Sequence, residues 1–272
     1  MSLTIYKANQ VIEASYRLSL NEQRVILACI AQVNSKEALL TTDEFELSAK
    51  DFASLFSISE KNAYAALVEV AENLFNRYVI IDNPDPKRPK IKRLKMRWLS
   101  SIKYFTDEGK ITLRFAQDML PYLSELKGQF TRYKLAHIAN MTSVYGIRLY
   151  ELLMQWKTTG KREVEIIWLK KHFQLSSEYD RMYDFKKRVL LPAIADINTH
   201  SDYTVTWEQR KTGRTVTHLM FTFAEKQPNT AAKPKEDRVL GVAKSVIAKQ
   251  AKVGESWEQA AKRIKAERVK RS

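Results

Sequence analysis

Residues 179–198 read "YDRMYDFKKRVLLPAIADIN", and this stretch decides how the rest of the chain is interpreted. Its apolar residues recur three or four positions apart, at Met182, Phe185, Val189, Ala193 and Ile197. This spacing predicts a helix with one apolar side. Lys187 and Arg188 point away from that side, and Arg181 lies on its flank. Cations in the first half of a helix oppose the dipole preference. A solvated polar face would also explain them, so the surrounding sequence has to decide.

The composition indicates a soluble globular protein with room for two domains. The chain has 272 residues, of which 44% are hydrophobic and 28% charged. No apolar run approaches the roughly 18 residues that span a bilayer, and the start "MSLTIYKANQ" lacks the apolar core of a signal peptide. We therefore expect a cytoplasmic protein without membrane contact. The single cysteine, Cys29, lies in the apolar run "RVILACIAQV" and is expected in the core.

The charge of the chain points to a polyanionic partner. The net charge is +15 and the pI about 9.7. The first 80 residues hold 7 basic and 10 acidic side chains, whereas residues 81–115 hold 10 and 4, and the last 48 residues hold 13 and 6. The positive charge is thus concentrated in particular segments.

The chain contains an internal repeat. Residues 51–81 and 168–207 both read as a short helix, a turn, a longer amphipathic helix and a β-branched strand. Phe52, Phe56 and Ile58 correspond to Leu169, Phe173 and Leu175 at an offset of 117, and Leu67, Val70, Ala71 and Leu74 correspond to Leu190, Ala193, Ile194 and Ile197 at an offset of 123. The offset of 123 also carries Ile26, Cys29 and Ile30 onto Leu149, Leu152 and Leu153, so each half begins with a further helix.

Each half then continues into paired strands. In the first half "YVIID" and "KIKRLKMRWLSSIKYF" flank the Pro-rich "NPDPKRP", and "TDEG" turns the chain into "KITLRF". In the second half two alternating strands flank "QRKTGR". Three helices and a hairpin, twice over, predict an α+β fold: two tandem winged helix-turn-helix domains related by pseudo-symmetry, followed by a basic C-terminal tail.

This fold places the basic residues where a helix-turn-helix contacts DNA. In a helix-turn-helix the helix after the turn enters the major groove, where its first residues reach base edges or phosphates. Arg181, Lys187 and Arg188, with the adjacent Lys186, are then candidate DNA-binding residues. The strand carrying Lys92, Arg93, Lys95 and Arg97 is a candidate for phosphate contact, although Lys on an edge strand can also serve to prevent aggregation. Arg210, Lys211 and Arg214 form the tip of the second hairpin and are weaker candidates.

A catalytic function finds no support in the sequence. There is no phosphate-binding G-x-x-x-x-G-K-[ST] loop, and His137, His172, His200 and His218 are scattered. We therefore expect no catalytic residues, no metal and no cofactor, and a nicking enzyme is a poor alternative. A winged-helix transcriptional repressor is a stronger alternative, because winged helices also serve that role.

Three passages resemble one family closely. They are "KANQVIEASYRLSLNEQRVIL" (7–27), "QFTRYKLAHIANMTSVYGIRLYELLMQW" (129–156) and "FKKRVLLPAIADINTHSDYTVTWEQRKTGRTVTHLMFTF" (185–223). They are similar to the replication initiators of iteron-carrying, theta-replicating bacterial plasmids, in the same order over about residues 7–224.

The resemblance implies a function and a set of partners. Monomers of such initiators bind direct repeats, called iterons, at the plasmid origin, and dimers bind an inverted repeat at the promoter and repress their own gene. The implied partners are double-stranded DNA, a second copy of the chain, and the host replication initiator and replicative helicase. Stretch 178–198 would be the recognition helix, while the first domain would grip backbone through Lys61, Asn62 and the basic strand from Lys90 to Arg97.

The resemblance and the repeat together suggest three parts. We expect an N-terminal winged-helix domain over residues 1–125 for dimerisation and backbone contact, and a C-terminal one over 126–224 for sequence-specific recognition. Residues 225–272 form a basic tail, partly disordered or helical. A capping box at "SWEQ" predicts a helix from about Ser256.

Overall fold

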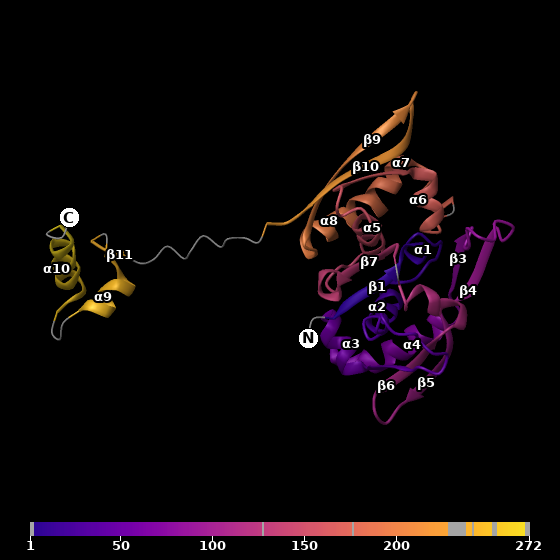
Figure 1. Cartoon of the computed structure of the whole chain (residues 1–272), viewed down its shortest axis with the longest axis horizontal. Coiled ribbons are helices and arrows are strands. Elements are labelled where there is room, and N and C mark those ends of the chain that lie inside the picture. The colour runs from indigo at the N-terminus through magenta and orange to yellow at the C-terminus, as the bar shows by residue number, and fades with distance from the viewer. Residues whose placement is uncertain are drawn as a thin grey trace. The chain divides into compact units, whose positions relative to one another are not determined.

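The structure is a computed structural model that describes residues 3–126, 128–175, 177–227, 238–240, 242–251 and 255–269. It divides into two compact units, Met1–Glu225 and Lys226–Ser272. Figure 1 shows the elements of both.

The two halves of the first unit contain equivalent elements. The first half contains α2 (Leu20–Ile30), β2 (Phe45–Ser48), α3 (Ala49–Phe56), the 3-10 turn η1 (Glu60–Asn62), α4 (Ala63–Phe75), β3 (Tyr78–Asp82), β4 (Arg93–Arg97), β5 (Leu99–Phe105) and β6 (Lys110–Phe115). The second half contains α5 (Val144–Met154), β8 (Lys161–Glu165), α6 (Ile166–His172), η4 (Ser177–Tyr179), α7 (Met182–Phe185), the π turn η5 (Lys186–Leu190), α8 (Leu191–His200), β9 (Tyr203–Thr212) and β10 (Thr215–Glu225). Between and before them lie β1 (Thr4–Ala8), α1 (Asn9–Ile12), η2 (Gln117–Tyr122), β7 (Phe130–Lys134) and η3 (Leu135–His137).

The sheets confirm the predicted pair of winged helices. The strand orders are β2-β6-β5 in the first half and β8-β10-β9 in the second, so each sheet joins the strand before the helix-turn-helix to the hairpin after it. The hairpin turns also match, because Gly109 and Gly213 both adopt a φ of 61°, which favours glycine.

The basic hairpin is not the counterpart of the second wing. The sequence suggested one strand running from the basic segment through Trp98, but the chain ends β4 at Arg97 and starts β5 at Leu99. Strands β3 and β4 pair only with each other and form a separate two-stranded sheet. The wing position belongs to β5 and β6, whose turn carries Asp107 and Glu108. The first domain therefore has an additional hairpin.

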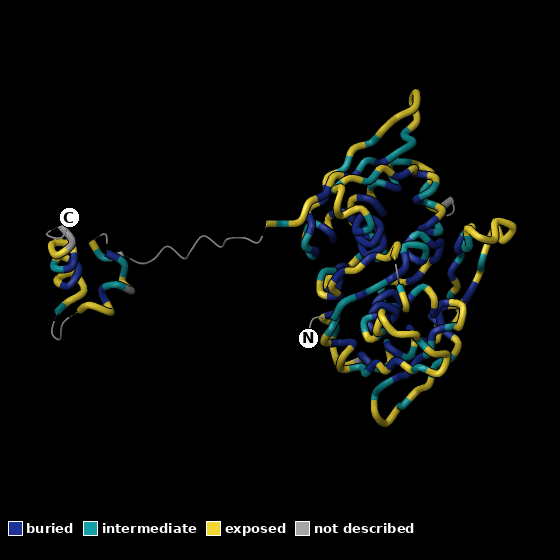
Figure 2. Tube along the Cα trace, viewed as in Figure 1, coloured by how far each residue is buried: buried dark blue, intermediate teal, exposed yellow. Residues whose placement is uncertain are grey.

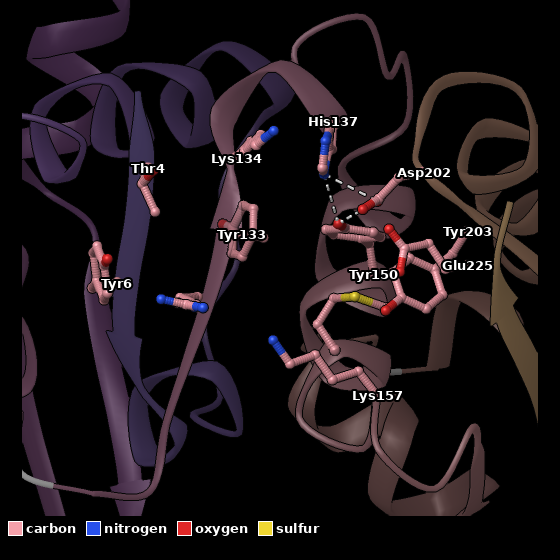
Figure 3. Close-up of a pocket in the computed structure, with 12 residues that line it drawn as sticks. Thr4, Tyr6, Tyr133, Lys134, His137, Tyr150, Lys157, Asp202, Tyr203 and Glu225 are labelled. Carbon is pink, nitrogen blue, oxygen red and sulfur yellow. Dashed lines mark hydrogen bonds and ion pairs between the residues drawn. The ribbon is translucent and has the colours of Figure 1, made fainter. Parts of the chain in front are cut away.

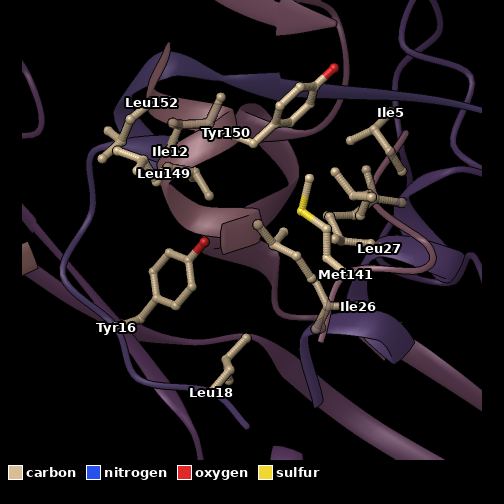
Figure 4. Close-up of a cluster of buried hydrophobic side chains, with 14 of the residues drawn as sticks. Ile5, Ile12, Tyr16, Leu18, Ile26, Leu27, Met141, Leu149, Tyr150 and Leu152 are labelled. Carbon is tan, nitrogen blue, oxygen red and sulfur yellow. The ribbon is translucent and has the colours of Figure 1, made fainter. Parts of the chain in front are cut away.

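The two halves share one hydrophobic core. Helices α2 and α5, which the offset of 123 makes equivalent, both contribute to it, and Ile26 and Cys29 of one helix and Leu149 and Leu152 of the other are all buried. Figure 4 shows side chains of both halves packed in this cluster. Cys29 is a core residue, as expected, and burial raises the pKa of its thiol to about 12.

The second long helix contains a wide turn that the sequence pattern missed. The helix begins at Met182 instead of 179, and its middle, Lys186–Leu190, is π-helical. Pro192 lies directly after that turn. Proline has no N–H to donate, and its ring crowds the carbonyl four residues back. The wider turn relieves this clash, which a regular α-helix could not accommodate. The apolar residues Phe185, Val189 and Ala193 nevertheless stay buried, as predicted.

One guanidinium joins the two halves at their centre. Arg148 of α5 is buried and donates to the carbonyls of Tyr16 at 2.9 Å, Ala14 at 2.8 Å and His172 at 3.2 Å. It also lies 3.5 Å from the centre of the Tyr16 ring. Ser15, between the two bound carbonyls, exchanges backbone hydrogen bonds with Ile80 of β3. The additional hairpin and the end of α6 are thus fixed to the same side chain.

The tail forms a small unit with more structure than the sequence predicts. It contains β11 (Arg238–Val239), β12 (Val242–Ala243), α9 (Lys244–Gln250) and α10 (Trp257–Val269). Its own cluster of buried side chains comprises Val242, Ile247, Ala260, Ala261 and Ile264. The predicted helix from about Ser256 is confirmed, because Ser256 and Gln259 bond reciprocally as a capping box.

We expect Arg148→Ala to lower the free energy of unfolding by about 2–5 kcal/mol, because three buried carbonyls lose their donor. Arg148→Lys should recover only part of this loss, since an ammonium cannot reproduce the planar fork. Urea unfolding measures both. Lys157→Ala, an exposed change just beyond the same helix, should stay within about 0.5 kcal/mol. Equal stability of Arg148→Ala and the wild type would contradict the central role of this side chain.

Candidate nucleic-acid interface

The second helix of the second helix-turn-helix consists of α7, η5 and α8, and we call it the recognition helix. It presents free cations at its start. Arg181 precedes α7 as its N-cap residue, and Lys187 and Arg188 lie in the π turn; all three side chains are exposed. Within the described part of the chain no carboxylate pairs with any of them. Tyr183, 67% exposed, lies one turn before Lys187, whose Nζ is 5.7 Å from the ring centre. The charge pattern of the sequence did not single out this tyrosine, although its spacing from Lys187 places it on the polar face.

Lys186 has a different position from its neighbours. Its side chain is half-buried, and Nζ donates to Oε1 of Gln209 on β9 at 2.5 Å. The ammonium also lies 5.4 Å from the centre of the Trp207 ring. Lys186 therefore connects the helix to the wing and is less available to a ligand than Lys187 or Arg188.

The turn before the helix is fixed by α6. Lys170 donates from Nζ to the carbonyl of Tyr179 at 2.6 Å, and Phe185 donates its backbone N–H to the carbonyl of Arg181 at 3.1 Å. These bonds hold the start of the recognition helix, and hence the direction of its first side chains, against the preceding helix.

The tip of the second wing is only partly free. Arg210 forms an ion pair with Glu163 at 2.6 Å, which neutralises it within the sheet. Lys211 and Arg214 are exposed, and neither has an ion-pair partner among the described residues. Figure 2 shows that the tips of this wing and of the basic hairpin are both exposed.

The basic hairpin contains both paired and free cations. Lys90 and Lys92 are exposed, precede β4, and have no ion-pair partner in the described part of the chain. On β4 itself the side chains point outward as predicted, but each has a neighbour. Arg93 pairs with Asp82 at 3.1 Å, Lys95 lies 3.9 Å from the centre of the Tyr78 ring, and Arg97 donates to the carbonyl of Phe75 at 2.6 Å.

An ion pair brings the basic hairpin to the second domain. Lys171 at the end of α6 pairs with Asp82 of β3. The hydrogen bond from Lys171, followed by that from Arg93, outweighs burial and lowers the pKa of the Asp82 carboxyl below its usual value. The ion pair thus joins β3 of the basic hairpin to α6, the first helix of the second helix-turn-helix (Figure 1).

The first helix-turn-helix contributes little free charge. Lys61 is exposed at the start of α4, where the sequence placed it, while the side chain of Asn62 lies outside the described residues. The wing of this domain is balanced internally, because Lys103 and Arg114 both pair with Glu44. Lys110 likewise pairs with carboxylates on either side, those of Glu46 and Glu108.

A cavity of about 430 Å³ lies on the domain junction and is lined from both halves (Figure 3). Across its wall His137 approaches Asp202 at 3.0 Å, and the Tyr150 hydroxyl donates to the same carboxylate at 2.9 Å. Burial raises the pKa of Asp202, but the bonds from His137 and Tyr150 outweigh it and leave the pKa below its usual value. This contact joins the segment after β7 to the start of β9.

His172 forms part of the same junction. Its ring stacks on Trp168, and Nδ1 lies 2.6 Å from the Trp168 carbonyl. Burial lowers the pKa of His172 to about 4, so the ring is neutral at neutral pH. Because its own carbonyl accepts from Arg148, protonation of this ring would place a charge beside the guanidinium.

Two kinds of feature are absent from the described residues. Across the described ranges no helix has the length and apolar character needed to cross a bilayer. In the same residues no group of three His, Cys, Asp or Glu side chains could hold a metal ion.

Fold and site together define a tandem winged-helix protein with a basic recognition helix. Two family models match the chain: Initiator Replication protein, WH1, over residues 4–154, and Initiator Rep protein, WH2, over residues 165–223. The chain belongs to this family of plasmid replication initiators, which are DNA-binding proteins without catalytic activity.

Individual relatives agree with this assignment. A replication initiation protein of Escherichia coli is 32% identical over 227 residues, which are 80% of this chain and 69% of that protein. The PI protein of Escherichia coli is 25% identical over 248 residues, 79% of this chain and 80% of its own. The crystal structure of Pi initiator protein in complex with iteron DNA has a TM-score of 0.71 at 25% identity, covering 83% of this chain and 98% of that one.

We expect the free energy of unfolding to fall as the pH is lowered from about 6.5 to about 4, partly because of His172. The unfolded chain binds a proton on this ring below pH 6.5, while the folded chain binds it only near pH 4, so acid favours unfolding in this window. His172→Gln should make the pH dependence shallower there, as measured by urea unfolding at several pH values. Identical profiles for variant and wild type would contradict the assignment.

Proposed function

We propose that this chain initiates plasmid replication by binding directly repeated DNA sites, iterons, at the plasmid origin as a monomer. The observation that carries the proposal is the set of free cations, Arg181, Lys187 and Arg188, at the start of the second helix of a helix-turn-helix. That placement is where a winged helix reaches the major groove. The structural match to an initiator that was crystallised on iteron DNA supports the same ligand.

In the proposed interface some residues contact base edges and others contact phosphates. Lys187 and Arg188 are placed to donate to base edges such as guanine O6 and N7, and Arg181 to a base or a phosphate. Lys211 and Arg214 on the second wing, with Lys61, Lys90 and Lys92 in the first domain, would contact phosphates. Arg93, Arg97 and Arg210 must first release their partners, so we assign them a smaller share of the binding free energy. Lys186 and Lys95 lie over aromatic rings, and we assign their main role to those contacts.

We place the domain boundaries at residues 1–125, 126–224 and 225–272. The WH1 family model extends to residue 154 and therefore includes α5. The equivalence of α5 and α2 at the offset of 123 supports counting α5 with the second domain. Strand β1 pairs with β7, so these two segments lie side by side whether the boundary is placed at residue 125 or at residue 154.

We further propose that dimers, formed through the first domain, bind an inverted repeat at the promoter and repress the gene of the chain. The host replication initiator and the replicative helicase are the proposed protein partners, in the bacterial cytoplasm. The alternative, a repressor without an origin function, would use the same fold. Two linked domains favour a long site over adjacent major-groove faces, since one module covers only about a helical turn.

A mobility-shift titration tests the proposed function. DNA with several tandem direct repeats from the plasmid that carries this gene should give a ladder with one step per repeat, and the plasmid should fail to establish without the gene. Binding to a palindrome alone, with normal plasmid establishment, would favour the repressor.

Two single variants test the division between readout and grip. Arg188→Ala should cost about 1–3 kcal/mol of binding and relax specificity at one base pair, whereas Lys92→Ala should weaken all sequences alike and lower the salt slope by about one. Binding isotherms on the repeat and on substituted repeats, at several salt concentrations, measure both effects. Arg132→Ala, an exposed change on the junction cavity, is the control and should leave sequence preference unchanged. Uniform, salt-independent losses from Arg188→Ala would contradict the readout.

A further inference from the structure

The tail folds as a unit of its own, outside the part of the chain that the family models cover. Both family models end by residue 223. The match to the DNA-bound initiator takes in 98% of that chain but 83% of this one. Val242 and Ile247 pack against Ala260, Ala261 and Ile264 in a cluster of the unit's own. This unit is therefore an addition whose function the family does not supply.

Ion pairing within the unit leaves three of its lysines without a carboxylate partner. Residues 238–272 contain ten basic and three acidic side chains, a net charge of +7. Two of the acids, Glu255 and Glu267, pair with Arg263 at 2.7 and 3.2 Å. Among the described residues no carboxylate pairs with the exposed Lys249, Lys262 or Lys265. Two of the three acidic groups are thus used internally, while these three lysines face solvent.

The apolar side of α10 is largely covered within the unit. Ala260, Ala261 and Ile264 are buried in the cluster of the unit, Lys262 lies on the opposite side, and Lys265 lies on the flank. A helix that enters a protein groove or a bilayer surface needs an exposed apolar stripe. Trp257, 50% exposed at the first position of α10, is a single apolar side chain and forms no such stripe with the buried residues. Charge is therefore the main feature that the described part of α10 offers to a partner.

We propose that the tail unit is a second DNA-binding module, which contacts the phosphate backbone of the duplex beside the winged-helix site without reading its sequence. The proposal rests on the proposed function. The link of residues 226–237 can span at most about 40 Å, and one helical turn of DNA is about 34 Å. Once the winged helices bind their repeat, phosphates about one turn away lie within reach, and the tether raises their effective concentration.

The test compares the full chain with a variant carrying Lys249→Gln, Lys262→Gln and Lys265→Gln. Each is measured on a duplex that ends at the direct repeat and on one that extends about two turns further. The slope of the logarithm of the binding constant against the logarithm of the salt concentration reports the number of phosphate contacts. On the longer duplex the magnitude of this slope should be lower for the variant by about two to three, which is about 0.9 for each lost contact. On the short duplex the two proteins should differ less. Truncation after Glu225 should reproduce the loss.

Controls separate this inference from the proposed function. Glu258→Gln, on the same exposed side of α10, removes an acid and should not lower the slope. Circular dichroism shows whether the triple variant keeps its helices, and the truncated chain gives an answer even if it does not. Equal slopes for the full chain, triple variant and truncation would overturn the inference, including in favour of a protein partner for the tail. Loss of preference for the repeat in every protein would instead overturn the proposed function.

Discussion

The buried guanidinium of Arg148 is the contact on which the arrangement of this protein depends. A winged helix can fold alone, but reading one long site requires two of them at a fixed spacing. Arg148 satisfies three carbonyls that come from the chain before α2 and from the end of α6. Because backbone groups buried without partners are costly, the segments cannot separate without exposing these carbonyls. Arg148 thus links the two domains at the centre of their common core, together with the pairing of β1 and β7 and the Lys171–Asp82 ion pair.

The same joint determines which basic surfaces act together. Ser15, between the carbonyls held by Arg148, pairs with β3, and the Lys171–Asp82 ion pair ties β3 to α6. The additional hairpin is thereby attached to the second domain as well as, through Trp98, to the wing of its own domain. The two domains have similar folds but differ in charge. The cations of the first wing are paired with carboxylates, while Lys211 and Arg214 of the second wing are free.

The sequence predicted the helices well because their signal is local. The repeat of apolar residues in α2, α4, α5 and the recognition helix is a consequence of helical periodicity, and it identified both the tandem fold and the cations at Lys187 and Arg188. Contacts between distant segments were not predictable in this way. Nothing local indicates that Arg148, in the run "YGIRLYELL", points inward, or that β1 pairs with β7 across more than a hundred residues.

Other misses have equally physical causes. The basic strand was assigned to the wing because alternation along a strand does not reveal which strand it pairs with. Pairing partners are chosen by tertiary contacts, and β4 pairs with β3 instead of β6. The free or paired state of Arg210 and Arg93 likewise depends on Glu163 and Asp82, and that proximity exists only in the folded chain.

The π turn at Lys186–Leu190 has a consequence for how such a protein can diversify. A turn with one extra residue rotates everything before it by about 100° relative to everything after it. Phe185 before the turn and Ala193 after it are both buried, so the present core fits this offset. Loss or gain of a single codon near Pro192 would therefore turn Tyr183 and Arg188 relative to α8, but it would turn the buried Phe185 and Val189 with them. A new direction for the exposed side chains thus requires a matching change in the core, which limits how such a helix can vary.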